Sequence, residues 1–263
     1  MSAETVRTGG KGHQPGRRPR FSIVTVVLNG EQGLPRTLTS VVNQTYRNFE
    51  LVVIDGGSSD GTIELIKGYQ RFIRYWISEP DRGIYDAMNK AIQVCRGDYL
   101  YFLNCGDTFA APDTLEQVVA RLDGATPDIV CGNVLQLHET GPRMFRYDIG
   151  SQYQLYRDTI CHQALFTARR VFATTGIFDI SYRISADREW LLRALKRHHF
   201  EICFIDLPVC LFDVTGVSSR QRTRLKIENL RINRAYFTWR FYPFLLRQLL
   251  AKVGRMALVQ KVG

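Results

Sequence analysis

The stretch YLYFLNCGDT, residues 99–108, decides how this chain is interpreted. A run of aromatic and aliphatic residues, typical of a buried strand, stops at a small polar turn that carries one carboxylate, Asp107. In a sheet of parallel strands with helices on both faces, ligands bind beyond the carboxyl ends of the strands. The position of Asp107 therefore makes it a candidate ligand-binding residue.

Strand-like and helix-like segments alternate on the N-terminal side of this stretch. FSIVTVV (21–27) and FELVVID (49–55) are continuous apolar runs, as expected for strands buried on both faces. A further strand is predicted at 73–79, and helices are predicted at 34–44, 62–70 and 84–95. Repeated units of this length predict an α/β fold with a mostly parallel sheet and helices on both faces.

The alternation becomes less regular after Asp107. We predict helices at 113–122 and 186–197, and strands, some of them on a mixed edge of the sheet, at 128–136, 145–149, 161–167, 200–206 and 209–214. A basic helical tail is expected from about residue 220.

Length and composition fit one large domain with appendages. The chain has 263 residues, of which 45% are hydrophobic, so a sizeable core can form. No apolar stretch of about 18 residues predicts a spanning helix, and the N-terminus lacks the apolar segment of a secretory signal. The six cysteines form no CxxC pair and have no zinc spacing. We therefore expect a reduced, cytoplasmic protein.

The net charge of +10 is concentrated at the two ends of the chain. Residues 1–20 carry +4, residues 220–263 carry +10, and the segment between them carries −4. The first segment is rich in Gly, Pro and Arg and is predicted to be a disordered basic tail. A nucleic-acid-binding protein should carry its basic face on a folded module, so this pattern argues against nucleic acid as a partner.

The C-terminal segment RAYFTWRFYPFLLRQLLAKVGRMALVQKVG (234–263) mixes aromatic, aliphatic and basic residues. Such a mixture suits an amphipathic helix that lies on an anionic membrane surface. The same helix could instead pack its apolar face on the domain or on a second subunit. The sequence leaves both alternatives open.

Neither a Walker A motif nor GxGxxG is present to bind phosphates through backbone amides. A divalent cation held by a strand-end carboxylate is the alternative way to bind a diphosphate, because Mg²⁺ and Mn²⁺ prefer hard oxygen ligands. Asp107 is placed for that task.

Three segments together carry a resemblance to a known family: FSIVTVVLNG (21–30), LTSVVNQTYRNFELVVIDGGSSDGT (38–62) and SEPDRGIYDAMNKAIQVCRGDYLYFLNCGDTF (78–109). They resemble the family 2 glycosyltransferases, which have the GT-A fold. CHQALFTARRVFATTGIFD (161–179) and ISADREW (184–190) extend the match more weakly. The chain is similar to bacterial cell-envelope enzymes such as the colanic acid and mycobacterial phenolic glycolipid glycosyltransferases.

The resemblance implies a division of the domain 21–219 into a nucleotide-binding half, 21–110, and an acceptor half, 111–219. It implies that Asp107 binds Mg²⁺ or Mn²⁺ and that Asp187 is the catalytic base. It also implies that the nucleotide is bound by residues at the strand ends and the turns that follow them: Val27, Asn29, Asp55, Asp81, Asp86, Asn104 and Gly106. The family carries a D-x-D-D cluster where this chain has Asn104-Cys105-Gly106-Asp107, so only the last carboxylate is kept.

Four residues keep alternative interpretations. Asp81 and Asp86 could hydrogen-bond the nucleotide or only complement the dipole of the helix that they precede or open. His162 could be structural, or it could act in the active site near the diphosphate or the metal. Asp187 could also serve as the N-cap of the helix at 186–197, because Asp favours that position.

The function implied is that of an inverting glycosyltransferase. It would move a sugar from a nucleotide-diphosphate sugar to a lipid-linked glycan or glycolipid, at the inner face of the bacterial plasma membrane. The alternative is a degenerate GT-A domain that binds a nucleotide or a partner without catalysis.

Overall fold

The computed structural model describes residues 20–138, 141–147, 160–198, 200–213 and 221–237. The chain divides into one unit that ends at Arg220 and a second that starts at Gln221. In the second unit the structure describes helix α9 (Arg222–Phe237), which exposes Ile227 and Leu230. The predicted N-terminal tail up to residue 19 and the aromatic part of the C-terminal tail, from residue 238, lie outside the described residues.

One nine-stranded sheet forms the centre of the first unit. Its strands lie in the order β3-β2-β1-β4-β8-β6-β9-β5, and β7 pairs with β6. Their bounds are β1 (Phe21–Val27), β2 (Phe49–Asp55), β3 (Tyr75–Ser78), β4 (Tyr99–Phe102), β5 (Thr108–Phe109), β6 (Ile129–His138), β7 (Gly141–Phe145), β8 (Leu165–Ala168) and β9 (Ile202–Asp213).

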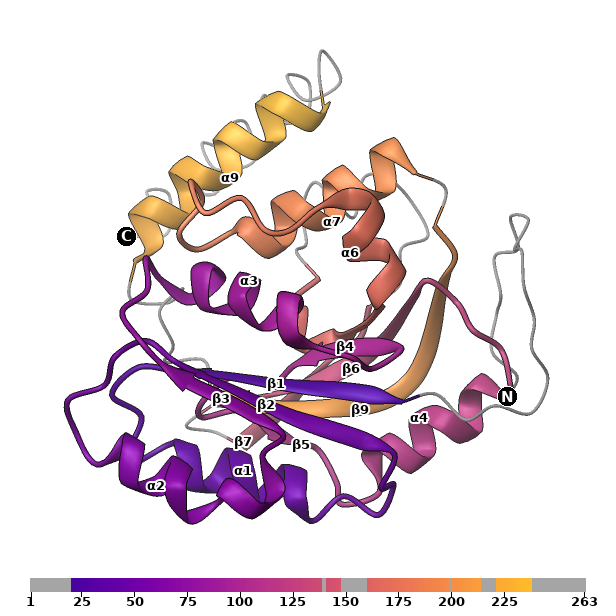
Figure 1. The fold of residues 1–263 in the computed structure, drawn as a ribbon. Coiled ribbons are helices and arrows are strands. Elements are labelled where there is room, and N and C mark those ends of the chain that lie inside the picture. Colours follow the sequence, from indigo (N-terminus) through magenta and orange to yellow (C-terminus); the bar gives the residue numbers. More distant parts are fainter. Residues whose placement is uncertain (1–19, 139–140, 148–159, 199, 214–220, 238–263) are drawn as a thin grey trace, which may run out of the picture. The chain divides into compact units, whose positions relative to one another are not determined.

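Helices cover both faces of this sheet, as predicted. In Figure 1, α1, α2 and α4 lie below the sheet and α3, α6 and α7 lie above it. Their bounds are α1 (Leu34–Val42), α2 (Thr62–Gly68), α3 (Ile84–Val94), α4 (Thr114–Leu122), α6 (Arg169–Thr175) and α7 (Ala186–Arg197). Two short 3₁₀ turns complete the described elements of this unit, η1 (Gln70–Phe72) and η2 (His162–Ala164).

The first four strands are parallel, and the rest of the sheet is mixed. β1 pairs in parallel with β2 and β4, and β2 with β3, so Val27 lies level with Asp55 and Asp55 with Ser78. All seven residues of β1 are buried, which matches its continuous apolar sequence. Beyond β4, strand β8 is antiparallel to both β4 and β6, whereas β6 and β9 are parallel. The mostly parallel arrangement therefore describes the first half of the sheet only.

Several predicted elements in the second half need correction. The strand expected at 145–149 is β7, which ends at Phe145. The strand expected at 161–167 begins only at Leu165, because 162–164 form the turn η2. The two strands expected around Pro208 are one strand, β9, since Pro208 lies at a register irregularity opposite Asn133, where a missing N–H is tolerated. β5 and α6 were not predicted.

An aromatic stack joins the parallel half of the sheet to the mixed half. The Tyr101 ring stacks on Phe166 of β8, with 4.1 Å between ring centroids, and on Phe109 of β5, with 5.3 Å. The Tyr101 hydroxyl donates to the carbonyl oxygen of Gln163 at 2.7 Å. This stack fixes the segment that carries His162 against the end of β4.

A buried carboxylate, Glu50, lies at the other end of the parallel strands, where they begin. Glu50 accepts hydrogen bonds from Ser22 Oγ at 2.5 Å and from the backbone N of Arg96 at 2.5 Å. It also pairs with Arg74 at 2.6 Å and with Arg20 at 3.2 Å. Burial opposes ionisation of Glu50, but these hydrogen bonds and charges together lower its pKa below the ordinary value. We call this group the Glu50 cluster.

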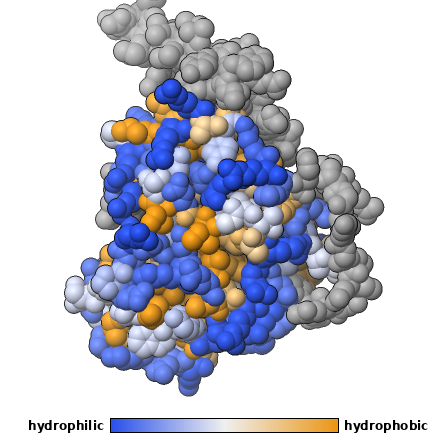
Figure 2. Space-filling view, turned by 45° about the horizontal axis from the view of Figure 1, so that its top comes forward, coloured by the Kyte–Doolittle hydropathy of each residue, from blue (hydrophilic) through white to orange (hydrophobic). Residues whose placement is uncertain are grey.

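One face of the described part is mainly polar (Figure 2). Figure 2 shows a face on which small groups of hydrophobic residues are scattered over a largely hydrophilic surface. Exposed apolar residues are normal on the surface of a folded domain. Among the helices the structure describes, none is both long enough and apolar enough to cross a membrane.

Candidate active site

The turn after β2 is organised by Asp55. Its side chain is fully buried and accepts four hydrogen bonds, from the backbone N of Gly57 and of Ser58 (3.0 and 2.9 Å), from Ser58 Oγ (2.5 Å) and from Ser78 Oγ (2.6 Å). These bonds hold the turn in one shape and tie it to the end of β3. Asp55 therefore lies at the carboxyl end of the parallel strands, as predicted, and its buried side chain fixes the shape of the turn that follows.

The turn after β1 lies beside the turn after β2. The Gly56 N–H donates to the carbonyl of Val27 at 2.9 Å, and the Asn29 N–H donates to Ser58 Oγ at 2.7 Å. Asn29 Oδ1 in turn accepts from the Ser59 N–H at 2.9 Å, with the Asn29 backbone at a φ of 50°. The structure thus brings together Val27, Asn29 and Asp55, as their strand-end positions predicted.

A third loop reaches the same place through Asp81. Its Oδ1 accepts from the Gly83 N–H at 2.7 Å, and its Oδ2 lies against Gly56, where an added Cβ would come within 2.4 Å of it. The same Cβ would also meet the Leu28 side chain at 3.5 Å, and Leu28 is 58% exposed. A carboxylate and an exposed apolar side chain therefore flank Gly56. Together they could bind the edge and the face of a planar base.

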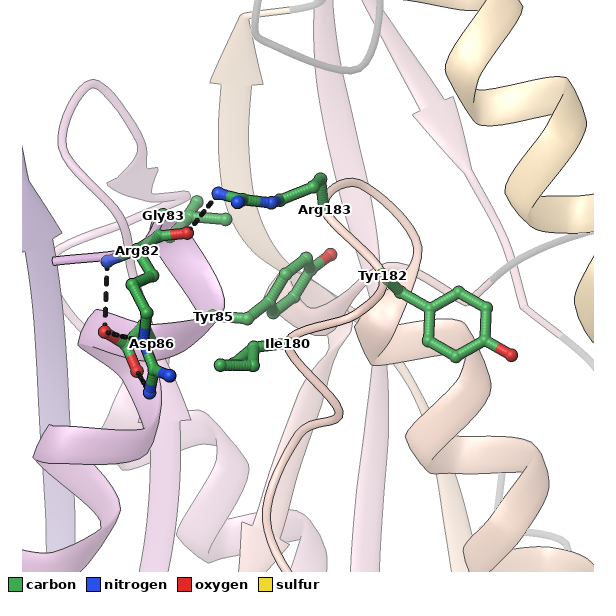
Figure 3. A pocket seen from close by; sticks show the side chains of 8 residues that line it. Arg82, Gly83, Tyr85, Asp86, Ile180, Tyr182 and Arg183 are labelled. Carbon is green, nitrogen blue, oxygen red and sulfur yellow. Dashed lines mark hydrogen bonds and ion pairs between the residues drawn. The ribbon is translucent and has the colours of Figure 1, made fainter.

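Asp86 contacts Arg82 in the loop before α3. Its carboxylate accepts from the Arg82 guanidinium at 2.9 Å and from the Arg82 backbone N at 3.0 Å, and this partner lowers the Asp86 pKa. It lines a small pocket at the start of α3, whose walls are Arg82, Gly83, Ile84, Tyr85, Asp86, Ile180, Tyr182 and Arg183 (Figure 3). Asp86 therefore orders the loop that carries Asp81, and its contacts do not include the turn at 55–58.

The turn that follows β4 is fixed from α1. Thr37 Oγ1 donates to the carbonyl of Asp107 at 2.7 Å and accepts from the Gly106 N–H at 2.9 Å. Gly106 has a φ of 97°, a backbone conformation that favours glycine. The Asp107 carboxylate accepts from Gln163 Nε2 at 3.1 Å. The predicted metal ligand is thereby held between α1 and the segment before β8.

His162 connects this turn to Asp187. Its Nε2 lies 2.8 Å from Asn104 Nδ2, and its Nδ1 lies 3.2 Å from Asp187 Oδ2. Asp187 lies in the first turn of α7, where the helix dipole favours an acidic side chain, and its Oδ1 is 3.0 Å from the Tyr85 hydroxyl. The N-cap position belongs to Ser185, so the capping alternative for Asp187 is wrong.

The chemistry of the turn fits a divalent cation that shares its ligands with a diphosphate. Asn104 is 7% exposed, and within the described part of the chain its Oδ1 has no hydrogen-bond partner. That oxygen and the Asp107 carboxylate are hard ligands of the kind Mg²⁺ and Mn²⁺ prefer. The described residues contain no group of three His, Cys, Asp or Glu side chains that could hold a metal alone. Mg²⁺ commonly binds through one or two protein oxygens, with phosphates and water completing the shell.

Sequence reasoning missed four residues of this site. Gln163 and Thr37 hold Asp107 and its turn, and Tyr85 contacts Asp187. Arg188 is buried beside Asp187; burial lowers its pKa to about 10, which still leaves it charged at neutral pH. Gln163 could have been found, because it follows His162 in the segment 161–179 that resembles the family. Tyr85 could not, because its spacing in the sequence indicates only a buried position on a helix.

Comparison with known proteins agrees with this architecture. The family described as glycosyl transferase family 2 matches residues 22–178. An uncharacterised glycosyltransferase of Mycobacterium tuberculosis is 36% identical over 230 residues, which are 86% of each chain. A PGL/p-HBAD biosynthesis glycosyltransferase of Mycobacterium bovis is 35% identical over 208 residues, 75% of this chain and 78% of the relative.

Two solved structures share the fold. S. aureus TarS in complex with UDP has a TM-score of 0.64 at 18% identity, over 74% of this chain and 60% of that one. The Pyrobaculum calidifontis mannosyltransferase PcManGT, in complex with GDP-Man and Mn²⁺, has a TM-score of 0.63 at 18% identity, over 84% of this chain and 64% of that one. At 18% identity, both similarities show a shared fold and nothing more. From its family match and its sequence relatives, the chain belongs to glycosyl transferase family 2 and has the GT-A fold.

Proposed function

We propose that this protein is an inverting glycosyltransferase that uses a nucleotide-diphosphate sugar, with Mg²⁺ or Mn²⁺ as cofactor. One observation carries the proposal. Asn104 and Asp107 at the end of β4 and Asp187 at the start of α7 belong to one polar cluster, which His162 and Gln163 connect. A metal-ligand set and a candidate base therefore lie together at the edge where α/β sheets bind ligands.

The donor nucleotide would lie across the turns that surround Gly56. Asp81 and Leu28 flank that glycine, and Asp55 and Asn29 hold the turns in place. At Val27 and Gly106 the backbone after the strands would lie close to the nucleotide. TarS in complex with UDP and PcManGT in complex with GDP-Man share this fold and support a nucleotide as the bound group.

In the reaction, Asp187 would take the proton of the acceptor hydroxyl. The acceptor oxygen then forms a bond to the anomeric carbon, on the face opposite the bond between that carbon and the diphosphate oxygen, which breaks. Attack from the opposite face inverts the configuration. A cation held by Asp107 and Asn104 would supply positive charge to the departing nucleoside diphosphate.

The acceptor we propose is a lipid-linked glycan or a glycolipid, met at the inner face of the plasma membrane. The name of the Mycobacterium bovis relative, an enzyme of PGL/p-HBAD biosynthesis, supports an acceptor of this class. The net charge of +10 in residues 220–263 supports contact with an anionic membrane surface.

The test is a donor screen on the purified chain. UDP-, GDP- and dTDP-sugars are each added with Mg²⁺, Mn²⁺ or chelator, and both thermal stabilisation and nucleoside diphosphate release are measured. We expect one nucleotide class to stabilise the protein only with metal, and Asp107→Ala to abolish that stabilisation. Asp187→Asn should keep the stabilisation and lose turnover by about 100- to 10,000-fold. Unchanged metal-dependent turnover in Asp107→Ala would contradict the proposal.

A non-catalytic GT-A domain is the second candidate. It is favoured by the single carboxylate in residues 104–107 and by the lack of a three-residue metal group in the described part of the chain. Donor binding in the wild type without any nucleoside diphosphate release, from any donor and metal in the screen, would support this candidate.

A further inference from the structure

The carboxylate of Asp187 is held on both of its oxygens by side chains from other elements. Tyr85 of α3 places its hydroxyl 3.0 Å from Oδ1 and 2.7 Å from the carbonyl oxygen of Ile184. His162 of η2 places its Nδ1 3.2 Å from Oδ2. Tyr85 is 5% exposed and packs its ring against Phe178, with 5.5 Å between centroids, so its hydroxyl has little freedom to move away.

The direction of the His162 contact follows from its two neighbours. Asn104 Nδ2 carries only donors, so the His162 Nε2 that it meets at 2.8 Å must accept. A neutral imidazole then carries its hydrogen on Nδ1 and donates it to Asp187. With the Asn104 amide reversed, a neutral ring would face the carboxylate with a lone pair, which is unfavourable. Asn104 therefore sets the tautomer that lets His162 hold Asp187.

We propose that Tyr85 and His162 are positioning residues for Asp187, which fix its carboxylate from opposite sides for proton transfer. This inference rests on the proposed function. Oδ1 accepts from the Arg188 N–H at 2.8 Å and shares the single hydroxyl hydrogen of Tyr85 with the Ile184 carbonyl, whereas among the described residues Oδ2 accepts only from His162. Oδ2 thus retains the lone pair that takes the acceptor proton.

Both positioning residues also reach the donor side of the site. His162 is held by Asn104 at the end of β4, and Tyr85 stands one residue inside α3, directly after the loop that carries Asp81. Asp187 is thereby aligned by two side chains that adjoin segments proposed to bind the donor. Its geometry should depend on these contacts even though neither side chain takes part in bond making.

The experiment compares variants that remove single hydrogen bonds. Tyr85→Phe keeps the ring and removes the hydroxyl. Tyr99→Phe is its matched control, because Tyr99 is equally buried and donates to a backbone carbonyl, that of Pro127, without touching Asp187. His162→Asn places an amide N–H where Nδ1 stands and keeps the bond to Asp187. His162→Gln extends toward Asn104 and leaves Oδ2 without its donor. The kcat and donor KM are measured for each, with thermal unfolding as the check on folding.

We expect Tyr85→Phe and His162→Gln to lower kcat by about 10- to 100-fold with donor KM little changed, as for a catalytic group that is slightly misplaced. Tyr99→Phe should stay within about twofold of wild type, and His162→Asn should recover most of the activity lost in His162→Gln. A wild-type kcat in Tyr85→Phe, or His162→Gln as active as His162→Asn, would overturn the inference. Failure of the proposed function looks different, since then the wild type is inactive or Asp187→Asn keeps its turnover.

Discussion

A carboxylate lies at each end of the parallel strands, and the two carboxylates are held in different ways: Glu50 is buried, whereas Asp187 is partly exposed. Glu50, where the strands begin, is ion-paired with two arginines and accepts further hydrogen bonds. Asp187, near the edge where the strands end, is held by a tyrosine and a histidine and keeps capacity for one more hydrogen bond within the described part. A buried carboxylate that pairs directly with cations stabilises a fold, whereas a partly exposed one that accepts hydrogen bonds from a tyrosine and a histidine can exchange a proton.

The largest expected difference comes from removing the negative charge at each edge. Glu50→Gln leaves two arginines facing a neutral amide, so the free energy of unfolding should fall by about 3–5 kcal/mol. Asp187→Asn should leave the free energy of unfolding within about 1 kcal/mol of wild type, while lowering turnover by about 100- to 10,000-fold. Denaturant unfolding and kcat, measured on both variants, test this contrast. Equal losses of stability would contradict it.

A smaller effect is expected from pH. The pKa of Glu50 in the folded protein lies below the ordinary value of 4.5, so its contribution to stability is complete at neutral pH and is lost as the pH falls below about 4.5. The thermal midpoint of the wild type should therefore drop more steeply on acidification than that of Glu50→Gln. If the thermal midpoints of the two proteins fall equally between pH 7 and pH 3, the Glu50 cluster does not cause the loss of stability in acid.

The smallest expected effect concerns the turns around Gly56 that are proposed to bind the donor. Gly56→Ala places a methyl group within 2.4 Å of the Asp81 carboxylate and should push it aside, raising the donor KM by up to about tenfold. Gly61→Ala is the matched control, because its methyl group would meet the Glu31 carboxylate, also at 2.4 Å, and Glu31 has no proposed role. Both variants should fold and keep the wild-type kcat. An equal rise in KM for Gly61→Ala would remove Asp81 from the donor site.

Elements with a strong local signal were predictable from the sequence. The bounds of β1 and β2 and the helix α7 are confirmed, because continuous apolar runs end at polar turns and the helix has a clear period. The turn η2 and the unbroken strand through Pro208 were not, since each depends on pairing with a distant strand.

The residues of the candidate site also fall into a predictable group and an unpredictable group. Strand-end residues such as Asn29 and Asp55 could be placed together, because parallel strands bring their carboxyl ends to one edge. The contacts of Tyr85 and His162 with Asp187 could not, because they join α3, η2 and α7, which no periodicity relates.

The position of β4, between β1 on one side and β8 on the other, sets an order for the assembly of the enzyme during its synthesis. The ribosome delivers the four parallel strands first, and they can pair through short crossover units. Asp187 follows β8 in the chain, so it emerges only after the strand that pairs with β4 on this side. A nascent chain therefore forms the turns proposed to bind the donor before Asp187, the proposed base, has emerged, and we expect sugar transfer only after most of the domain has left the ribosome.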